Sequence, residues 1–250
     1  MKLLSTILLC SLVFSSQSAW ADEDDERYRS PRRFAMEFKF GVYRPNVDEE
    51  VNNLNTDGSK TFTPYTDIFG AGEPFSFQFE FDYQIWQGFG SIGIGLSLGF
   101  SQNTALACED DTKDTGAKYS SCSTRTAGST SFTVFPISVL AVYRFDVLAK
   151  YLNIPIVPFV KAGMNYTMWW SSGSSGDTVG GSWGWQVNAG GALLLDWLEP
   201  SAAKSLDNDM GINHTYLFFE FLHSRANSFG KFNARHVGDT TWHAGLAIEF

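Results

Sequence analysis

Hydrophobic and polar residues alternate one by one along several stretches of the chain. The longest unbroken example is FSFQFEFDYQI, residues 75–85, in which Phe, Tyr or Ile holds every second position and Ser, Gln, Glu or Asp the positions between. Successive side chains of a β-strand point to opposite faces, so this segment is predicted to be a strand with one apolar and one polar face. Similar patterns cover residues 34–43, 91–101, 156–170, 183–195, 215–225 and 241–250, and residues 132–145 are apolar on both faces.

These segments together predict the fold class. An even number of strands of roughly ten residues, with aromatic residues toward their ends, is typical of outer-membrane barrels. The sequence therefore predicts an all-β fold, an eight-stranded antiparallel transmembrane β-barrel with both termini periplasmic. Glycines of residues 91–101 fall on the interior face, where side chains would crowd a narrow barrel. The long polar segments 46–74 and 102–129 are the predicted outward loops, and a short helix is predicted to begin near Pro200.

The first residues predict export. Lys2 precedes an apolar run, and Ala19 and Ala21 form an A-x-A cleavage site, so residues 1–21 are predicted to be a signal peptide. Residues 22–33 are charged and aperiodic and are predicted to be a flexible periplasmic lead-in, and residues 34–250 form the predicted barrel. We expect an integral protein of the bacterial outer membrane, in contact with outer-membrane lipid and lipopolysaccharide.

Composition narrows the range of partners. The formal charge is −9 and the sequence pI is about 4.9, which excludes nucleic acid as an expected partner, because phosphate binding needs clustered Lys and Arg. Cys108 and Cys122 are predicted to form a disulfide in an oxidising compartment. Acidic residues lie between them, but their spacing fits no standard Ca²⁺ loop, so no metal and no cofactor is predicted.

Charged residues on the polar faces are the first candidate site. The interior of an eight-stranded barrel is narrow enough for side chains to fill it, and buried charges are costly unless paired. We expect these residues to form a polar plug; the alternative is a gate whose cations exchange partners and open a narrow path favouring cations. The set comprises Glu37, Lys39, Glu80, Asp82, Arg144, Lys161, Glu220 and Glu249.

Aromatic residues and the last strand suggest how the barrel meets the membrane. Residues 241–250 are similar to the terminal strand signal that the assembly machinery of outer-membrane proteins reads, which implies that machinery as a partner. In this segment the apolar face comprises Trp242, Ala244, Leu246, Ile248 and Phe250, of which Trp242, Leu246, Ile248 and Phe250 are the predicted signal. The predicted aromatic girdle comprises Trp169, Trp170, Trp183, Trp185 and Trp242.

Two groups of residues invite a catalytic or metal-site interpretation. Lipid A deacylases use a His and a Ser two residues apart beside an Asn. Here His223 and Ser224 lie near Asn227 but are adjacent, so they point to opposite faces of the strand, and no catalytic residue is predicted. His236, Asp239 and His243 gather around the last outward loop. A metal or acid–base site needs a further convergent group, and the sequence does not reveal one, so no metal site is predicted there.

The segment INHTYLFFEF, residues 212–221, follows LEPSAAKSLDND and resembles an uncharacterised family of small outer-membrane β-barrels from myxobacteria and relatives. The likeness is strongest over residues 193–221, and the architecture also resembles the OmpA and OmpX type. The resemblance implies a small membrane barrel and brings no catalytic motif. We therefore expect a non-enzymatic structural or surface-interaction protein, with an unknown ligand at its outward loops. The alternatives are a narrow cation-preferring pore, a lipid A-modifying enzyme and a lipocalin-like soluble barrel.

Overall fold

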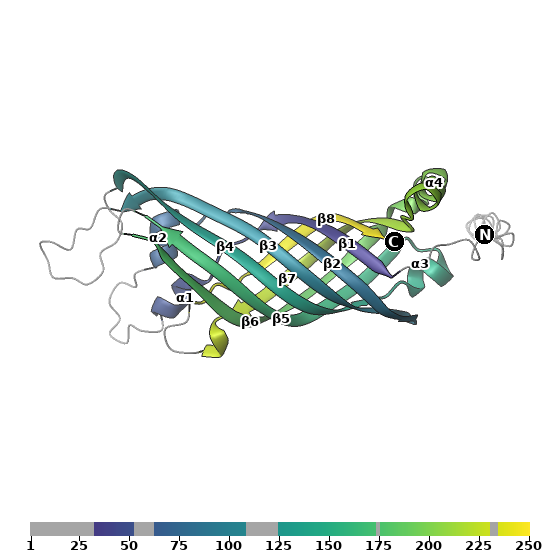
Figure 1. The fold of residues 1–250 in the computed structure, drawn as a ribbon, viewed down its shortest axis with the longest axis horizontal. Coiled ribbons are helices and arrows are strands. Elements are labelled where there is room, and N and C mark those ends of the chain that lie inside the picture. Colours follow the sequence, from purple (N-terminus) through teal and green to yellow (C-terminus); the bar gives the residue numbers. More distant parts are fainter. Residues whose placement is uncertain (1–32, 53–62, 109–124, 174–175, 231–234) are drawn as a thin grey trace, which may run out of the picture. The chain divides into compact units, whose positions relative to one another are not determined.

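A closed antiparallel barrel is the dominant feature of the computed structural model, which describes residues 33–52, 63–108, 125–173, 176–230 and 235–250. Eight strands within these ranges pair in sequence order, and the last returns to the first (Figure 1). The predicted eight-stranded antiparallel barrel is confirmed, and its membrane location with periplasmic termini stays a prediction. The predicted signal peptide and most of the lead-in lie outside the described residues. The strands are β1 (Phe34–Val42), β2 (Phe75–Gly88), β3 (Gly90–Cys108), β4 (Arg125–Arg144), β5 (Ile156–Ser172), β6 (Thr178–Leu194), β7 (His214–Ala226) and β8 (Thr240–Glu249).

Pairing of β1 with β8 closes the barrel. Their register runs from Ala35 opposite Glu249 to Gly41 opposite His243. Beyond the ladder, the backbone N–H of Phe34 donates to the carbonyl oxygen of Phe250 at 2.8 Å. Phe250 therefore lies beside the start of β1, at one end of the barrel.

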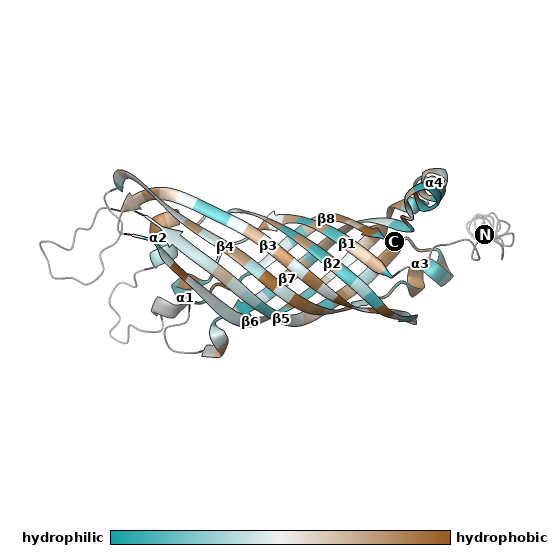
Figure 2. Ribbon diagram, viewed as in Figure 1, coloured by the Kyte–Doolittle hydropathy of each residue, from teal (hydrophilic) through white to brown (hydrophobic). Residues whose placement is uncertain are grey.

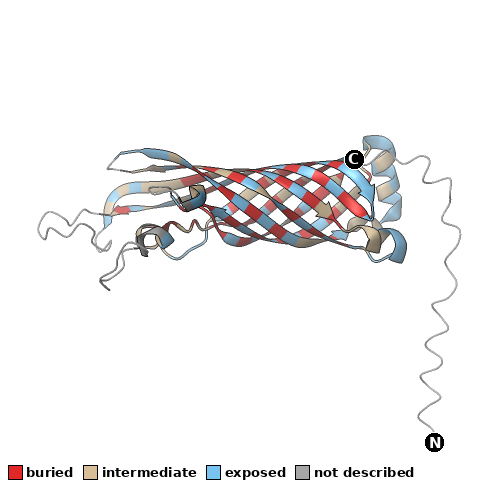
Figure 3. Cartoon of the chain, turned by 90° about the horizontal axis from the view of Figure 1, so that it is seen from below, coloured by how far each residue is buried: buried red, intermediate tan, exposed pale blue. Residues whose placement is uncertain are grey.

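Alternation along the strands places apolar side chains outside and polar side chains inside, as predicted. In β2, for example, Phe75 is 63% exposed, whereas Glu80 is fully buried. Buried and exposed residues form a chequered pattern over the barrel wall (Figure 3), and hydrophobic and hydrophilic positions alternate along several strands (Figure 2). Interior glycines make room for this polar filling, since a Cβ at Gly95 would lie 2.3 Å from Oδ1 of Asp82.

The β3–β4 hairpin is longer than the sequence predicted. Residues 102–108 and 125–129 were expected in an outward loop, but they continue the ladder, with Leu106 opposite Ser129. Thr and Ser residues in these segments are compatible with an extended backbone, and pairing supplies partners for their peptide groups. The guanidinium of Arg125 also donates to the carbonyl oxygens of Leu106 and Ile68, both at 2.9 Å, which ties the hairpin to a neighbouring helix.

Short helices occupy both ends of the barrel (Figure 1). One end carries α1 (Val47–Asn52), α2 (Pro64–Phe69) and the 3-10 turn η4 (Ser228–Gly230), and is called the α1/α2 end. The other carries α3 (Val147–Leu152), the 3-10 turn η3 (Leu195–Trp197) and α4 (Pro200–Met210), and is called the α3/α4 end. The helix predicted near Pro200 is confirmed. Among the residues that the structure describes, no helix is both long and apolar enough to cross a membrane.

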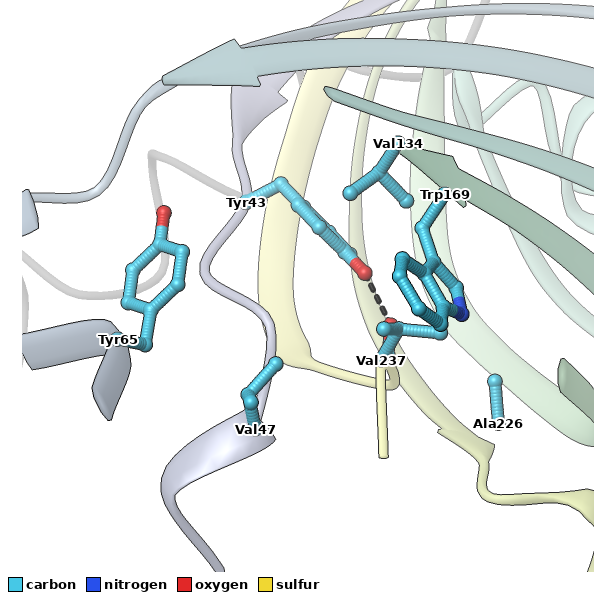
Figure 4. Packing of buried hydrophobic residues seen from close by; sticks show 7 residues of the cluster. All are labelled: Tyr43, Val47, Tyr65, Val134, Trp169, Ala226 and Val237. Atoms are coloured by element: carbon cyan, nitrogen blue, oxygen red, sulfur yellow. Dashed lines mark hydrogen bonds between the residues drawn. The ribbon is translucent and has the colours of Figure 1, made fainter. Parts of the chain in front are cut away.

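A hydrophobic cluster fills the barrel interior toward the α1/α2 end (Figure 4). Trp169, predicted to belong to the outward girdle, is only 9% exposed and belongs to this cluster. The prediction was wrong because Trp169 and Trp170 are adjacent in β5 and must point to opposite faces. The tyrosine hydroxyl of Tyr43 donates to the carbonyl oxygen of Val237 within the cluster. This α1/α2-end cluster comprises Tyr43, Val47, Tyr65, Val134, Trp169, Ala226 and Val237.

A second hydrophobic cluster fills the interior toward the α3/α4 end. It draws residues from the starts or ends of β5, β6, β7 and β8, and Ala149 of α3 packs against it. The rings of Phe159 and Phe218 meet edge to face, with centroids 6.1 Å apart. This α3/α4-end cluster comprises Val157, Phe159, Ala192, Tyr216, Phe218 and Ala247.

Candidate functional site

The charged residues predicted to line the lumen form one connected group. All eight are buried, and they come from strands around the whole barrel: β1 and β2 supply two each, and β4, β5, β7 and β8 supply one each. The prediction rested on alternation alone, because parity along a strand decides which face a side chain occupies. We call this set the lumenal network: Glu37, Lys39, Glu80, Asp82, Arg144, Lys161, Glu220 and Glu249.

Two lysines, one from β1 and one from β5, link carboxylates of β1, β2 and β7. Nζ of Lys39 lies 2.8 Å from both Glu80 Oε2 and Glu220 Oε1. Nζ of Lys161 lies 2.5 Å from Glu37 Oε2 and 2.6 Å from Glu80 Oε1. Glu37 and Glu80 are directly opposite each other in the β1–β2 register, where like charges repel. The lysines offset this repulsion and hold strands together across the lumen.

Arg144 extends the network toward the α3/α4 end. Its Nη2 lies 2.6 Å from Glu37 Oε1 and 2.5 Å from Asp82 Oδ2, and its Nη1 lies 3.0 Å from Glu249 Oε1. A guanidinium suits this position because its several N–H groups reach different carboxylates in one plane. Arg144 therefore joins carboxylates of β1, β2 and β8 from β4.

Neutral polar residues complete the network, and their role was not predicted. Tyr216 donates to Glu249 Oε2 at 3.1 Å, and Nδ2 of Asn188 donates to Glu220 Oε1 at 3.1 Å. Gln186 donates in turn to Oδ1 of Asn188 at 2.9 Å and accepts from Ser138 at 2.9 Å. Alternation placed Asn188 and Gln186 on the interior face, but it carries no information on which partner each would meet.

Oxygen atoms of Glu37, Glu80 and Asp82 lie within 4.8 Å of one another, a spacing that suits a metal ion. Each of these carboxylates already contacts a Lys or Arg nitrogen at 2.8 Å or less. Positive side chains therefore hold the place that a cation would take, and the group is an ion-pair cluster. Carboxylates nevertheless outnumber cations in the lumenal network.

His236, Asp239 and His243 do not form a common site. Nδ1 of His236 lies 3.0 Å from Glu49 Oε2, beside α1. His243 points into the lumen, is fully buried, and has no hydrogen-bond partner for either ring nitrogen among the described residues. The sequence placed the three residues near one end but not against one another.

Asp239 lies just before β8 and fixes the neighbouring backbone. Its Oδ2 accepts the N–H of Arg44 at 2.8 Å, and its Oδ1 accepts the N–H of Thr240 at 2.7 Å. Burial raises the pKa of the carboxyl from 3.8 to about 6, against the opposing effect of these two hydrogen bonds.

The raised pKa of Asp239 predicts a pH effect on stability. Between about pH 4 and pH 6 the folded chain retains a proton that the unfolded chain has lost, so this residue lowers the free energy of unfolding as pH rises through that window. Asp239→Asn removes this titration. The free energy of unfolding of the variant, relative to that of wild type, should therefore increase as the pH rises from about 4 to about 6. Urea unfolding of both proteins in lipid vesicles across the window measures this; parallel pH profiles would contradict it.

His223 and Ser224 point to opposite faces, as predicted. His223 is on the outer face, where Nδ1 lies 2.7 Å from Oγ1 of Thr240. Ser224 is buried, and its Oγ accepts the N–H of Asp239 at 3.1 Å. The described contacts therefore give the serine hydroxyl no activating histidine.

The predictions that remain concern the terminal strand, the disulfide and the aromatic girdle. Trp242, Leu246 and Ile248 lie on the outer face of β8, and the ring of Phe250 is 6.3 Å from that of Phe34. Cys108 ends β3, but Cys122 and the acidic segment before it lie outside the described residues, so the disulfide stays a prediction. Of the five tryptophans predicted to form the girdle, the four that are exposed on the outer face are Trp170, Trp183, Trp185 and Trp242.

Comparison with known proteins finds distant similarity to solved structures of outer-membrane proteins. No protein-family model matches the chain, and no curated protein matches it. Solved structures similar to it include the outer membrane protein OprG from Pseudomonas aeruginosa, at 12% identity and a TM-score of 0.48, covering 89% of this chain and 97% of that one. A major outer membrane protein from Thermus thermophilus has 12% identity and a TM-score of 0.47, covering 88% and 100%. The outer membrane enzyme PagL has 11% identity and a TM-score of 0.36, covering 86% and 98%.

The strand pairing of this chain itself defines its class, an eight-stranded closed antiparallel β-barrel. The TM-scores of the similar structures are below 0.5, so the class does not rest on them. A myxobacterial relationship stays a prediction.

Proposed function

We propose that the protein is an integral barrel of the bacterial outer membrane. The support is its inverted polarity: large apolar side chains such as Phe75, Ile94 and Leu217 are exposed on the outside, while Lys39 and Glu80 are fully buried inside. A lipocalin-like soluble barrel would need the reverse, with its apolar face around a ligand. Such a wide apolar exterior suits lipid, because soluble monomers rarely expose a contiguous apolar surface of this extent to water.

The barrel is closed to ions, and its role is structural, with its end surfaces available for interaction. The observation that carries this proposal is the lumenal network, in which Lys161 of β5 pairs with Glu37 of β1 and Arg144 of β4 pairs with Glu249 of β8, across the interior. The α1/α2-end cluster fills the lumen on one side of the network, and the α3/α4-end cluster packs directly against it, with the rings of Phe159 and Phe218 near Lys161 and Lys39. An ion would have to disrupt these pairs and clusters to pass.

The α1/α2 end faces the cell exterior and the α3/α4 end faces the periplasm. This orientation agrees with the longer connections at the α1/α2 end, since outer-membrane barrels carry longer loops outside. Lipopolysaccharide then surrounds the outer half of the wall, and an unidentified ligand would meet the α1/α2 end. The barrel assembly machinery is the expected partner during insertion. We assign no enzymatic role, because His223 and Ser224 lie on opposite faces.

Ion flux from lipid vesicles tests the closed lumen. We expect potassium-loaded phosphatidylcholine vesicles containing the refolded protein to retain potassium as well as protein-free vesicles do. A shift in gel mobility between unheated and heated samples verifies folding. Release that scales with the amount of folded protein would overturn the closed lumen.

A narrow cation-preferring pore is the second candidate, favoured by the excess of carboxylates in the lumenal network. It predicts potassium release by the wild-type protein, and a change of ion selectivity on Arg144→Ala. The closed barrel predicts retention by wild type whatever the variant does.

A further inference from the structure

Within the described part of the chain, no residue of helix α4 is buried, so its apolar face is open. Met210, in its last turn, is 71% exposed. Ala203, Leu206 and Met210 follow at spacings of three and four, so they share one face of the helix. An isolated helix of this length is marginal in water, and most helices are stabilised by packing of an apolar face.

Exposed apolar residues continue from this helix onto the turn before it and onto the outer wall. Trp197 of η3 and Leu198 are each 63% exposed. These two residues follow the end of β6. The next strand, β7, begins soon after α4 at His214 and exposes Leu217 on its outer face. The apolar surface of the segment 197–210 is therefore continuous along the chain with the wall that we propose to face lipid.

The other two connections at the α3/α4 end also expose large apolar side chains. Tyr151 and Leu152 of α3 are 73% and 60% exposed, and Phe89, between β2 and β3, is 66% exposed. Each connection thus presents an aromatic side chain at the rim where the barrel leaves the predicted bilayer. Aromatic and aliphatic residues at this depth are typical of the membrane interface.

We infer that η3 and α4 form an interfacial anchor that lies on the periplasmic leaflet of the same membrane, with Trp197, Leu206 and Met210 toward the lipid. This inference rests on the proposed membrane location. The lipid surface it fits is neutral or zwitterionic, because residues 195–210 carry a single cation, Lys204, against four acidic residues, Asp196, Glu199, Asp207 and Asp209. Amphipathic helices of this kind bury their apolar face at the headgroup boundary.

Site-directed labelling tests the anchor. The full mature chain, with Cys108→Ser and Cys122→Ser, is refolded into phosphatidylcholine vesicles with one introduced cysteine carrying an environment-sensitive fluorophore. Met210→Cys reports on the apolar face. Asn208→Cys is the matched control, since Asn208 is exposed and lies on the opposite face of α4. Leu217→Cys, on the outer face of β7, reports on insertion of the barrel itself.

We expect doxyl-labelled lipid to quench the labels at positions 210 and 217 strongly and the label at 208 weakly, with water-soluble iodide giving the reverse order. Quenching at 217 without quenching at 210 would overturn the anchor and leave the membrane barrel standing. Equal quenching at 210 and 208 would also overturn it, as would quenching at 210 that requires anionic phosphatidylglycerol. Absence of quenching at 217 would overturn the proposed membrane location together with the anchor.

Discussion

Lys161→Ala is expected to lower the free energy of unfolding by about 3–5 kcal/mol, the typical cost of leaving a buried charge without its partner. Lys161 is 1% exposed and contacts Glu37 and Glu80, which face each other across β1 and β2. Without its ammonium group, these carboxylates repel in a site that water does not reach. Urea unfolding in phosphatidylcholine vesicles, followed by gel mobility and tryptophan fluorescence, measures the loss.

Lys150→Ala is the matched control for this variant. Nζ of Lys150 lies 2.6 Å from Asp146 Oδ2, but the pair lies on α3 at the rim of the barrel, with the lysine side chain 27% exposed. Pairs of this kind contribute about 0–1 kcal/mol, so the control should unfold almost as wild type does. Adding Glu80→Gln to the Lys161 variant should restore part of the stability, because it removes one of the opposed charges. Equal effects of the two lysine substitutions would contradict a buried ion-pair network.

Gly245→Ala is expected to lower the free energy of unfolding by about 1–3 kcal/mol, the usual cost of overpacking an interior. Gly245 lies on β8 opposite Lys39, at the pairing that closes the barrel. A Cβ there would lie 1.9 Å from the carbonyl oxygen of Phe38 and 3.1 Å from Cα of Lys39. Because both atoms belong to the backbone of β1, the two strands must move apart to admit the methyl group. The urea midpoint of the refolded variant measures the effect.

Gly191→Ala provides the control in the same barrel. A Cβ at this position of β6 meets no atom within 4 Å, so the methyl group needs no displacement. Alanine restricts the unfolded chain more than glycine does, and the variant should match or slightly exceed wild-type stability, by up to about 1 kcal/mol. A Gly191 variant as unstable as the Gly245 variant would show that the loss does not come from closure of β1 on β8.

The sequence determined which side chains lie inside the barrel because strand geometry has a period of two. Once β1 and β2 were recognised, the buried positions of Lys39, Glu80 and Asp82 followed directly. Which carboxylate meets which cation did not follow, because it depends on the stagger between strands and on how side chains reach across the lumen. Thus Arg144 of β4 joins Glu249 of β8, a contact that no local pattern in the chain indicates.

The ends of the barrel were the least predictable part. Tyr65 of α2 packs with residues of β4 and β5 in the α1/α2-end cluster, through contacts between segments far apart in the sequence. The polar residues 102–108 and 125–129 are suited to a loop, yet backbone pairing between them makes them the end of β3 and the start of β4. Trp169 was assigned to the girdle by residue type, whereas parity within β5 places it inside.

Single-channel recording in planar phosphatidylcholine bilayers is the most direct test of the closed lumen, because it detects even brief openings of one molecule. The folded wild-type protein, inserted at a density verified by gel mobility of reconstituted material, should give no conductance steps at either polarity. Reproducible steps from the folded wild-type protein, absent after heat unfolding, would contradict a barrel sealed by its lumenal network and would establish it as a pore.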